Sequence, residues 1–203
     1  VFGAMGFGCI VVLLVGFWRI KTIFPKAQRN TVKLNFKEIL NYIMISLMVN
    51  IGICYFTNFD VIIIKHYFSS EMAGIYSSAA VLSKLILYIS TAIIVALFPM
   101  AVESKANIDT ANKILKKAFF YGGGLSILAA IALIILARPM VMLLYGGEYI
   151  EAVKYIPILS IMIVVLSLVS ILSNYALALN KTRVLILSFG LGIIISIIGS
   201  IIF

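Results

Sequence analysis

Long apolar runs constrain the fold of this chain more than any other feature. About 20 apolar residues are enough to cross the hydrocarbon core of a bilayer as one helix, and runs of this order recur along the whole sequence. They do not alternate apolar with polar residues, as the strands of a membrane barrel do. The chain is 64% apolar and 11% charged, whereas soluble domains are about 45–50% apolar and about 25% charged. We therefore predict an all-α, polytopic membrane protein.

Six transmembrane spans are predicted, and several are long enough to be tilted. They are placed at residues 1–18, 39–65, 74–102, 118–144, 153–179 and 184–203. The longest polar stretch, residues 19–38, contains Pro25 and separates the first span from the others. We interpret it as a linker between two helical bundles. Because the chain begins and ends inside apolar runs, we expect it to be a fragment of a longer polytopic protein.

Basic residues gather in every second loop, which predicts the orientation of the chain. Loops 19–38, 103–117 and 180–183 contain Arg19, Lys21, Lys26, Arg29, Lys33, Lys37, Lys105, Lys113, Lys116, Lys117, Lys181 and Arg183. The opposite side has Lys65, Arg138 and Lys154. Cytoplasmic loops are enriched in Lys and Arg, so we expect these three loops to be cytoplasmic. The same rule accounts for most of the net charge of +9, and we predict no nucleic-acid partner.

The sequence offers little for metal or cofactor chemistry. Cys9 and Cys54 lie inside apolar spans without a metal-binding spacing, and we interpret them as small apolar packing residues. His66 is the one histidine, and snorkelling to the membrane interface explains it together with Lys65. We predict no metal site and no cofactor.

Two ionisable residues, Asp60 and Lys84, lie inside predicted spans. A charged side chain at the centre of a membrane helix costs about 2.5–3.5 kcal/mol on insertion scales, so it normally faces a bundle interior, a wet cavity or a partner. We expect both residues to face a shared cavity. A direct Asp60–Lys84 ion pair is the alternative, and it requires the two helices to be offset.

Polar residues form one stripe on each of three spans, because residues seven apart share a helix face. The stripes are Tyr42, Ser46, Asn50, Thr57 and Asp60; Ser70, Ser77, Lys84 and Thr91, with Tyr88 and Pro99 beside them; and Ser160, Ser167 and Asn174. Either the stripes line a hydrated cavity, or they join helices through hydrogen bonds. The candidate cavity residues are Lys84, Asp60, Asn50, Ser77, Tyr88, Thr57 and Asn174.

Three backbone features complete the predictions. Pro99 should kink or end its helix and is the candidate hinge. The run Gly122-Gly123-Gly124 is either a hinge or a site of close helix packing. Gly192, Ser196 and Ser200 form a ladder of small residues that is typical of helix contacts.

The order of several short motifs resembles the oligosaccharide flippases of the MOP superfamily, the Wzx-type polysaccharide exporters. The residues that carry this resemblance, over about residues 35–183, are Asn58-Phe59-Asp60-Val61-Ile62-Ile63-Ile64, Met72-Ala73-Gly74-Ile75-Tyr76, Leu97-Phe98-Pro99, Leu143-Leu144-Tyr145-Gly146-Gly147-Glu148-Tyr149 and Ala178-Leu179-Asn180-Lys181. The resemblance implies that residues 1–18 are the last helix of a first lobe, 19–38 a cytoplasmic linker and 39–203 most of a second lobe.

The same resemblance implies a function without a chemical reaction. Such proteins move lipid-linked oligosaccharides on a polyprenyl diphosphate across the cytoplasmic membrane by alternating access, for surface polysaccharide assembly. Implied partners are membrane lipids, a polysaccharide polymerase and chain-length proteins. Lys84 would be the counter-charge of the diphosphate, and Asp60 would set the pKa of a neighbour or bind a coupling cation.

Three rival functions remain open at this point. A cation-coupled multidrug exporter of the MATE type shares the two-lobe architecture, but it is expected to use acidic residues, whereas the mid-membrane charge here is Lys84. A membrane-embedded prenyl-phosphate glycosyltransferase would need paired carboxylates, a catalytic histidine or a large polar loop. A structural subunit without transport activity is the last alternative.

Overall fold

The computed structural model describes residues 36–104, 108–179 and 182–202. The chain divides into two compact units, residues 1–39 and 40–203, and the fold described here is that of the second. The predictions for the span at 1–18, for Cys9, for nearly all of the linker at 19–38 and for residues 180–181 lie outside the described residues.

Helices make up the described part of the chain, which contains no strand. They are α2 (Phe36–Tyr67), α3 (Ser70–Glu103), α4 (Ile108–Ala118), the π-helical turn η2 (Phe119–Gly123), α5 (Gly124–Ile135), α6 (Ala137–Tyr145), the 3₁₀ helix η3 (Gly147–Lys154), α7 (Ile156–Ala178) and α8 (Thr182–Ile202). The predicted all-α class is thus confirmed.

Four helical stretches are long and apolar enough to cross a membrane: Ile39–Tyr67, Ser70–Glu103, Asp109–Ile135 and Ile156–Ala178. The first, second and fourth correspond to the predicted spans at 39–65, 74–102 and 153–179. The predicted span at 184–203 corresponds to α8, whose described apolar part, Ser188–Gly199, is shorter than a full crossing. The four long apolar helices make this a membrane protein, and six spans remain a prediction.

Short local signals set the boundary between α2 and α3. The basic residues Lys65 and His66 occupy the last turn of α2, where positive charge interacts favourably with the helix dipole. Ser69 then caps α3, its hydroxyl accepting a 3.3 Å hydrogen bond from the Met72 N–H. Further along, α3 continues through Pro99 and ends at Glu103, so the proline lies in the last turns of the helix.

The prediction that span 4 begins at residue 118 was wrong. Helix α4 starts at Ile108 and leads through η2 into α5 without an intervening loop. Its lysines at 113, 116 and 117 are exposed, whereas Ala111, Ile114 and Ala118 are buried. This spacing is that of an amphipathic helix. The lysines lie on the outer face of a helix, and their charge alone does not make a loop.

The predicted end of span 4, at residue 144, was also wrong. Helix α5 ends at Ile135, and a new helix, α6, begins after Leu136. Pro139 lies three residues further on, and a proline has no N–H to bond the carbonyl four residues earlier, which here belongs to Ile135. The break therefore follows from the proline. Gly146, with φ +85°, then turns the chain from α6 into η3.

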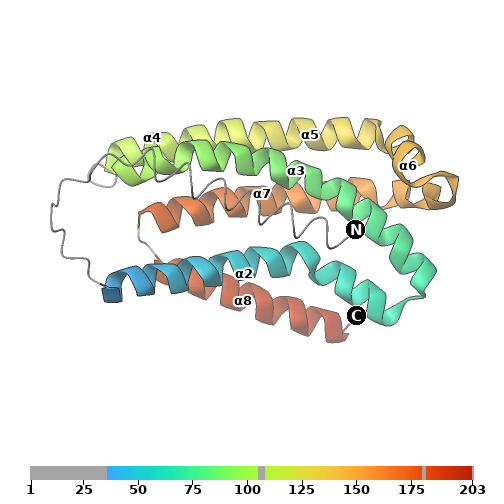
Figure 1. Ribbon diagram of the computed structural model, residues 1–203, viewed down its shortest axis with the longest axis horizontal. Coiled ribbons are helices and arrows are strands. Elements are labelled where there is room, and N and C mark those ends of the chain that lie inside the picture. Colours follow the sequence, from blue (N-terminus) through green and yellow to red (C-terminus); the bar gives the residue numbers. More distant parts are fainter. Residues whose placement is uncertain (1–35, 105–107, 180–181, 203) are drawn as a thin grey trace, which may run out of the picture. The chain divides into compact units, whose positions relative to one another are not determined.

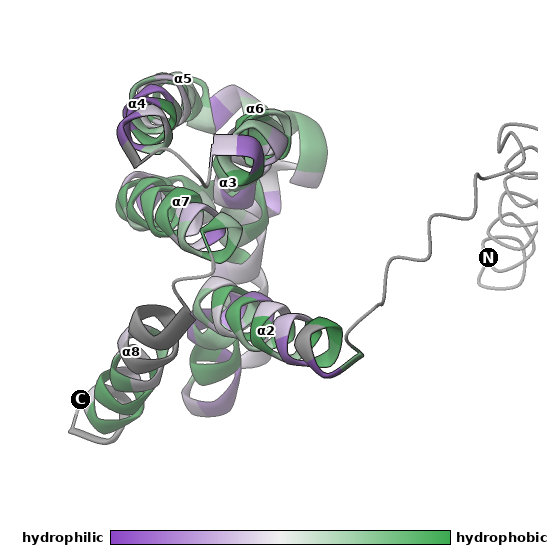
Figure 2. Cartoon of the chain, turned by 90° about the vertical axis from the view of Figure 1, so that its left-hand side faces the viewer, coloured by the Kyte–Doolittle hydropathy of each residue, from purple (hydrophilic) through white to green (hydrophobic). Residues whose placement is uncertain are grey.

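Helix α7 occupies the centre of the bundle. In both views it lies between the group formed by α3, α4 and α5 and the pair formed by α2 and α8 (Figures 1 and 2). Its most extensive contacts are with α3, followed by α5. The main core packs Ile86 and Leu82 of α3 against Leu133 of α5 and Ile156 and Leu159 of α7.

The glycines at 122 and 123 allow α7 to approach η2 closely. A Cβ added at Gly122 would lie 2.7 Å from Ile171 Cδ1, and one at Gly123 would lie 2.9 Å from Leu168 Cδ2. Both distances are shorter than van der Waals contact. The glycine run was interpreted as either a hinge or a site of close helix packing, and these distances support close packing at Gly122 and Gly123.

Large apolar side chains cover much of the outside of these helices. Figure 2 colours much of α5, α7 and the described part of α8 as hydrophobic. Examples are Leu143, Ile135 and Ile195, which are 86%, 73% and 68% exposed. A soluble monomer rarely exposes apolar area on this scale, so lipid is the solvent that fits this surface.

Candidate functional site

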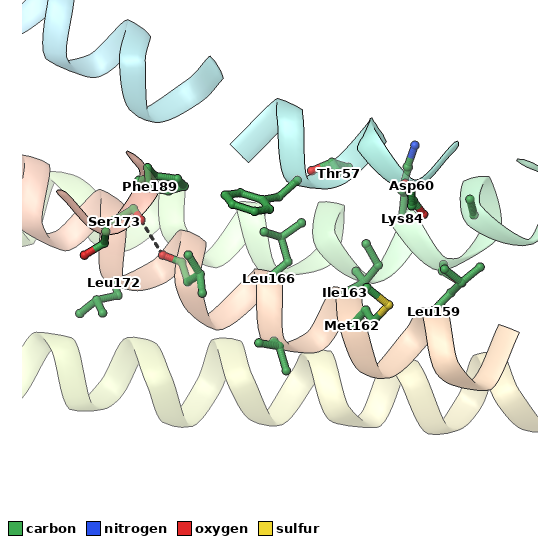
Figure 3. Close-up of a pocket in the computed structure, with 16 residues that line it drawn as sticks. Thr57, Asp60, Lys84, Leu159, Met162, Ile163, Leu166, Leu172, Ser173 and Phe189 are labelled. Atoms are coloured by element: carbon green, nitrogen blue, oxygen red, sulfur yellow. Dashed lines mark hydrogen bonds between the residues drawn. The ribbon is translucent and has the colours of Figure 1, made fainter. Parts of the chain in front are cut away.

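A cavity of about 470 Å³ lies between α2, α3, α7 and α8 (Figure 3). Its volume falls within the range of about 300–1,000 Å³ that is typical of ligand sites. The lining residues are Phe56, Thr57, Asp60, Ala80, Ser83, Lys84, Leu159, Met162, Ile163, Val165, Leu166, Val169, Leu172, Ser173, Ser188 and Phe189. Three residues predicted from the sequence, Lys84, Asp60 and Thr57, are therefore brought together at one cavity.

The two charged residues lie toward one end of this cavity. In Figure 3, Asp60 and Lys84 lie near Leu159 and Met162, at the start of α7, whereas Phe189 lies at the opposite end. Aliphatic and aromatic side chains form most of the remaining wall. The cavity therefore has its two ionisable residues toward one end, and beyond them a mostly apolar wall that also contains Ser173 and Ser188.

Lys84 is held by an amide of α2. Its Nζ donates a 2.9 Å hydrogen bond to Asn58 Oδ1. The Asn58 amide is fixed in turn, because its Nδ2 donates to the Cys54 carbonyl one helical turn earlier, at 2.8 Å. Lys84 lines the cavity, but its Nζ is bonded to Asn58, which is exposed and is not among the lining residues. Asn58 contributes no negative charge to this contact.

Asp60 has a different partner on α3. Its Oδ2 accepts a 2.8 Å hydrogen bond from the Tyr76 hydroxyl, and the Tyr76 ring packs edge-on against Tyr155. The other oxygen, Oδ1, is buried and has no hydrogen-bond partner within the described residues. No salt bridge joins Asp60 to Lys84 in this part of the chain. The two residues share a cavity and have separate partners, so the direct pair is not the arrangement found.

We expect Tyr76→Phe to lower the free energy of unfolding by about 1–3 kcal/mol, because it removes the hydrogen bond that the partly buried Asp60 carboxylate accepts within the described residues. Denaturation of the purified protein in mixed micelles measures the change. Tyr121→Phe is the matched control, since Tyr121 is 59% exposed and its hydroxyl forms no hydrogen bond within the described part of the chain. Equal stability of the two variants would show that the Asp60–Tyr76 bond contributes nothing.

Reciprocal ring contacts join α2 to α8 at the apolar end. A Cβ at Gly52 of α2 would lie 2.6 Å from Cδ1 of Phe189, and a Cβ at Gly192 of α8 would lie 2.9 Å from Cζ of Phe56. Each glycine thus accepts a phenylalanine ring from the other helix. The two rings also contact each other, with centroids 6.2 Å apart, and both line the cavity.

Four residues predicted from the polar stripes lie outside the cavity lining. Asn50 is exposed, and its amide donates to the Ser46 carbonyl of its own helix at 2.8 Å. Tyr88 is 67% exposed, and Ser77 is partly buried. Asn174 lines a separate pocket of about 20 Å³. A role of these four residues in binding stays a prediction.

Within the described residues, the buried stripe serines of α7 bond no other helix: Ser160 Oγ has no hydrogen-bond partner, and Ser167 donates to the Ile163 carbonyl of its own helix. Ser160 and Ser167 of α7 are fully buried and are not among the cavity residues. Ser90 of α3 and Ser126 of α5 form a buried hydroxyl–hydroxyl bond. In membranes such bonds contribute about 0.6–2 kcal/mol, so this pair helps to hold α3 against α5.

We expect a double-mutant cycle of Ser90→Ala and Ser126→Ala to give a coupling energy of about 0.6–1.7 kcal/mol. The hydroxyls bond each other across two helices, so removing either one leaves its partner with only a carbonyl of its own helix. Unfolding in micelles of the wild type, both single variants and the double variant provides the four values. Strict additivity would contradict this contact.

Two residues of the site, Asn58 and Tyr76, were not among the predicted candidates. Both belong to the motifs that carried the family resemblance, which is the signal that contained them. The described residues contain no group of three or more His, Cys, Asp or Glu side chains arranged to hold a metal ion.

Comparison with known families places the chain in a class. Long apolar helices around a charged, largely apolar cavity define a polytopic membrane protein with an internal ligand-sized site. The chain matches the model of the polysaccharide biosynthesis protein family over residues 5–154. It belongs to that family, and the resemblance to Wzx-type proteins of the MOP superfamily is confirmed. Neither the comparison with curated proteins nor that with solved structures gave a match.

Proposed function

We propose that this protein is a flippase that moves lipid-linked oligosaccharides on a polyprenyl diphosphate across the cytoplasmic membrane for surface polysaccharide assembly. Membership of the polysaccharide biosynthesis family supports the pathway. The four long apolar helices support a position within the bilayer. In this proposal the protein transports its ligand without changing it, and no cofactor takes part.

The observation that carries the proposal is Lys84, a basic residue within a long apolar helix that contributes to the cavity wall and whose Nζ is held by a neutral amide beside it. A diphosphate is anionic, and its attraction to a cation is much stronger in a low-dielectric site than in water. Because Asn58 orients Lys84 without neutralising it, the anion need not displace a carboxylate. This arrangement suits an anionic headgroup better than a neutral sugar alone.

The proposed architecture has two lobes that rock around the ligand. Residues 1–18 would be the last helix of the first lobe, 19–38 a cytoplasmic linker and 39–203 most of the second lobe. Loops 103–117 and 180–183 would be cytoplasmic as well, with residues 108–117 forming the start of a helix. A polysaccharide polymerase and chain-length proteins would be the partners that take the product.

One observation favours a second candidate, a cation-coupled multidrug exporter of the MATE type. Asp60 lines the same cavity, and its Oδ1 has no partner within the described residues. A carboxylate in this position could attract a cationic drug. The charge of Lys84 at the same end of the cavity opposes that binding, which is why we place the flippase first.

Transport by the intact protein in proteoliposomes tests the two candidates against each other. One set of vesicles carries a fluorescent lipid-linked oligosaccharide, whose appearance on the opposite face is read by accessibility to a lectin. A second set carries a cationic dye and a sodium or proton gradient. We expect movement of the lipid-linked oligosaccharide only. Movement of the dye without movement of the oligosaccharide would favour the exporter.

A further inference from the structure

We propose that three lysines on the outer side of α4 bind the headgroup of an anionic phospholipid of the surrounding bilayer. Lys113, Lys116 and Lys117 make up this lysine face. It belongs to a helix of which no described residue lines the cavity between α2, α3, α7 and α8. The inference needs only the position of the chain in a membrane, so it is independent of what the protein transports.

The three lysines share one side of α4 because of their spacing. Residues three and four apart are neighbours on a helix surface, and Lys116 and Lys117 follow Lys113 at these two intervals. All three lysines are exposed, whereas Ala111 and Ile114 are buried against the bundle. Within the described residues, none of the three lysines forms a salt bridge. Their positive charge is therefore presented to the surroundings of the bundle.

The charge of α4 as a whole favours an anionic ligand. Its one acidic residue, Asp109, lies in the first turn, where a negative charge interacts favourably with the helix dipole. Three lysines against one aspartate leave α4 with a net positive charge, which lies in the second half of the helix. In a zwitterionic headgroup the phosphate is balanced by the lipid's own ammonium group. Charge complementarity therefore selects an anionic lipid.

The sequence after α4 places the lysine face at the height of lipid headgroups. No charged residue occurs between Lys117 and Arg138, and the helical stretch Asp109–Ile135 is long and apolar enough to cross a membrane. At about 1.5 Å per residue, the uncharged residues 118–137 extend about 30 Å, which is the thickness of the hydrocarbon core. Helices α4 and α6 lie at opposite ends of the bundle (Figure 1). Lys117 and Arg138 therefore mark the two edges of this core.

An exposed aromatic pair follows the lysines directly. Phe120 and Tyr121 are 77% and 59% exposed, and their rings contact each other edge-on, with centroids 5.5 Å apart. Tyrosine is enriched at membrane–water interfaces, because its ring is apolar and its hydroxyl is polar. A lipid can contact both features, with its phosphate at the lysines and its acyl chains at the rings. A soluble acidic protein could contact the lysines, but not rings that lie one turn deeper in the bilayer.

Lipid binding by the intact protein tests the site. Native mass spectrometry of the protein in detergent gives dissociation constants for phosphatidylglycerol and phosphatidylcholine from the number of lipids that stay bound. We expect phosphatidylglycerol to bind more tightly, and inorganic phosphate at the same concentration not to displace it, because phosphate has no chains to contact the aromatic pair. Equal affinities for the two lipids, or displacement by phosphate, would overturn the lipid site.

Removing the charge of the lysine face should weaken this binding strongly. Each lysine near an anionic lipid surface contributes about fivefold to affinity. The triple variant Lys113→Gln, Lys116→Gln and Lys117→Gln should therefore bind phosphatidylglycerol about tenfold to a hundredfold more weakly. Glutamine is also a good helix former, so α4 should stay folded. The corresponding triple arginine variant keeps the charge and should retain most of the affinity.

A second triple variant is the matched control, because it removes the same amount of charge elsewhere. Lys65→Gln, Arg138→Gln and Lys154→Gln replace exposed residues on three different helices, α2, α6 and η3. These residues do not share one helix face, so we expect the affinity for phosphatidylglycerol to stay close to that of the wild type. An equal loss of affinity in the two glutamine variants would show an effect of net charge alone and overturn the site.

Photo-cross-linking of the unaltered protein in nanodiscs gives a measurement that does not depend on the folding of a variant. The probe is phosphatidylglycerol with a diazirine beside its headgroup. We expect labelling to concentrate in residues 113–121, and labelling spread evenly over both ends of the bundle would contradict the proposal. None of these measurements involves transport, so the lipid site and the proposed flippase can fail separately.

Discussion

Replacing Lys84 with alanine is expected to reduce transport of the lipid-linked oligosaccharide by about tenfold to a hundredfold. The estimate corresponds to the loss of one hydrogen bond to a charged group, about 1.5–3 kcal/mol. Lys84 lines the cavity and is held by Asn58 at 2.9 Å, so its removal deletes the cation that the proposed mechanism requires. The measurement is the initial rate in proteoliposomes, normalised to the amount of protein inserted.

Two further variants make this result interpretable. Lys84→Arg keeps the positive charge and should retain a substantial part of the rate. Lys154→Ala removes a lysine whose side chain is 71% exposed and which pairs only weakly with Glu151, at 3.8 Å, so its rate should equal that of the wild type. Wild-type transport by Lys84→Ala at normal membrane levels would remove Lys84 from the mechanism.

Substituting Gly52 with alanine should lower the free energy of unfolding by about 1–3 kcal/mol. The new Cβ would lie 2.6 Å from Phe189 Cδ1, so α2 and α8 must separate or the ring must rotate. Thermal unfolding in detergent, followed by the loss of soluble protein, measures the change. Because Phe189 also lines the cavity, part of the displacement should reach the site.

A glycine without neighbours provides the control for that experiment. Gly190, on α8, has no atom within 4 Å of an added Cβ, and alanine is the better helix former. We expect Gly190→Ala to be neutral or slightly stabilising. The double variant Gly52→Ala with Phe189→Leu should recover part of the stability, because a smaller side chain relieves the overlap. Equal melting temperatures for Gly52→Ala and Gly190→Ala would rule out the contact.

Sequence patterns were sufficient to locate the long apolar helices. They were insufficient to locate helix ends where charged residues lie on one face of a helix. The spans around 39–65 and 74–102 could be located because apolar length alone decides them. The start of span 4 could not, since the exposed lysines of α4 were read as a loop although Ala111 and Ile114 carry a helical apolar face. Apolar composition did not locate its end, because apolar residues continue past Pro139, whereas the proline removes the helical hydrogen bond to the Ile135 carbonyl.

The candidate site was predictable only in part, for a geometric reason. Helical periodicity shows which residues share a face, but it does not show which neighbour that face meets. Asp60 and Lys84 could be singled out because an ionised group in a membrane span is costly wherever it points. Asn50 lies on the same predicted stripe as Asp60. Only the later part of α2 lines the cavity together with α7 and α8, however, and Asn50 precedes that part. Tyr76 could be recognised as a partner only once α2 and α3 were placed.

The hydrogen bond between Lys84 and Asn58 has an energetic consequence for the motion of α2. Two polar side-chain bonds connect α2 to α3, Tyr76 to Asp60 and Lys84 to Asn58, and lipid gives little hydrophobic force to hold helices together. An anion that takes the ammonium group from Asn58 weakens one of these two connections. Binding of an anion and contact between α2 and α3 would therefore compete for the same proton donor, the Lys84 ammonium group. An anion that binds this group tightly would also weaken the attachment of α2 to α3.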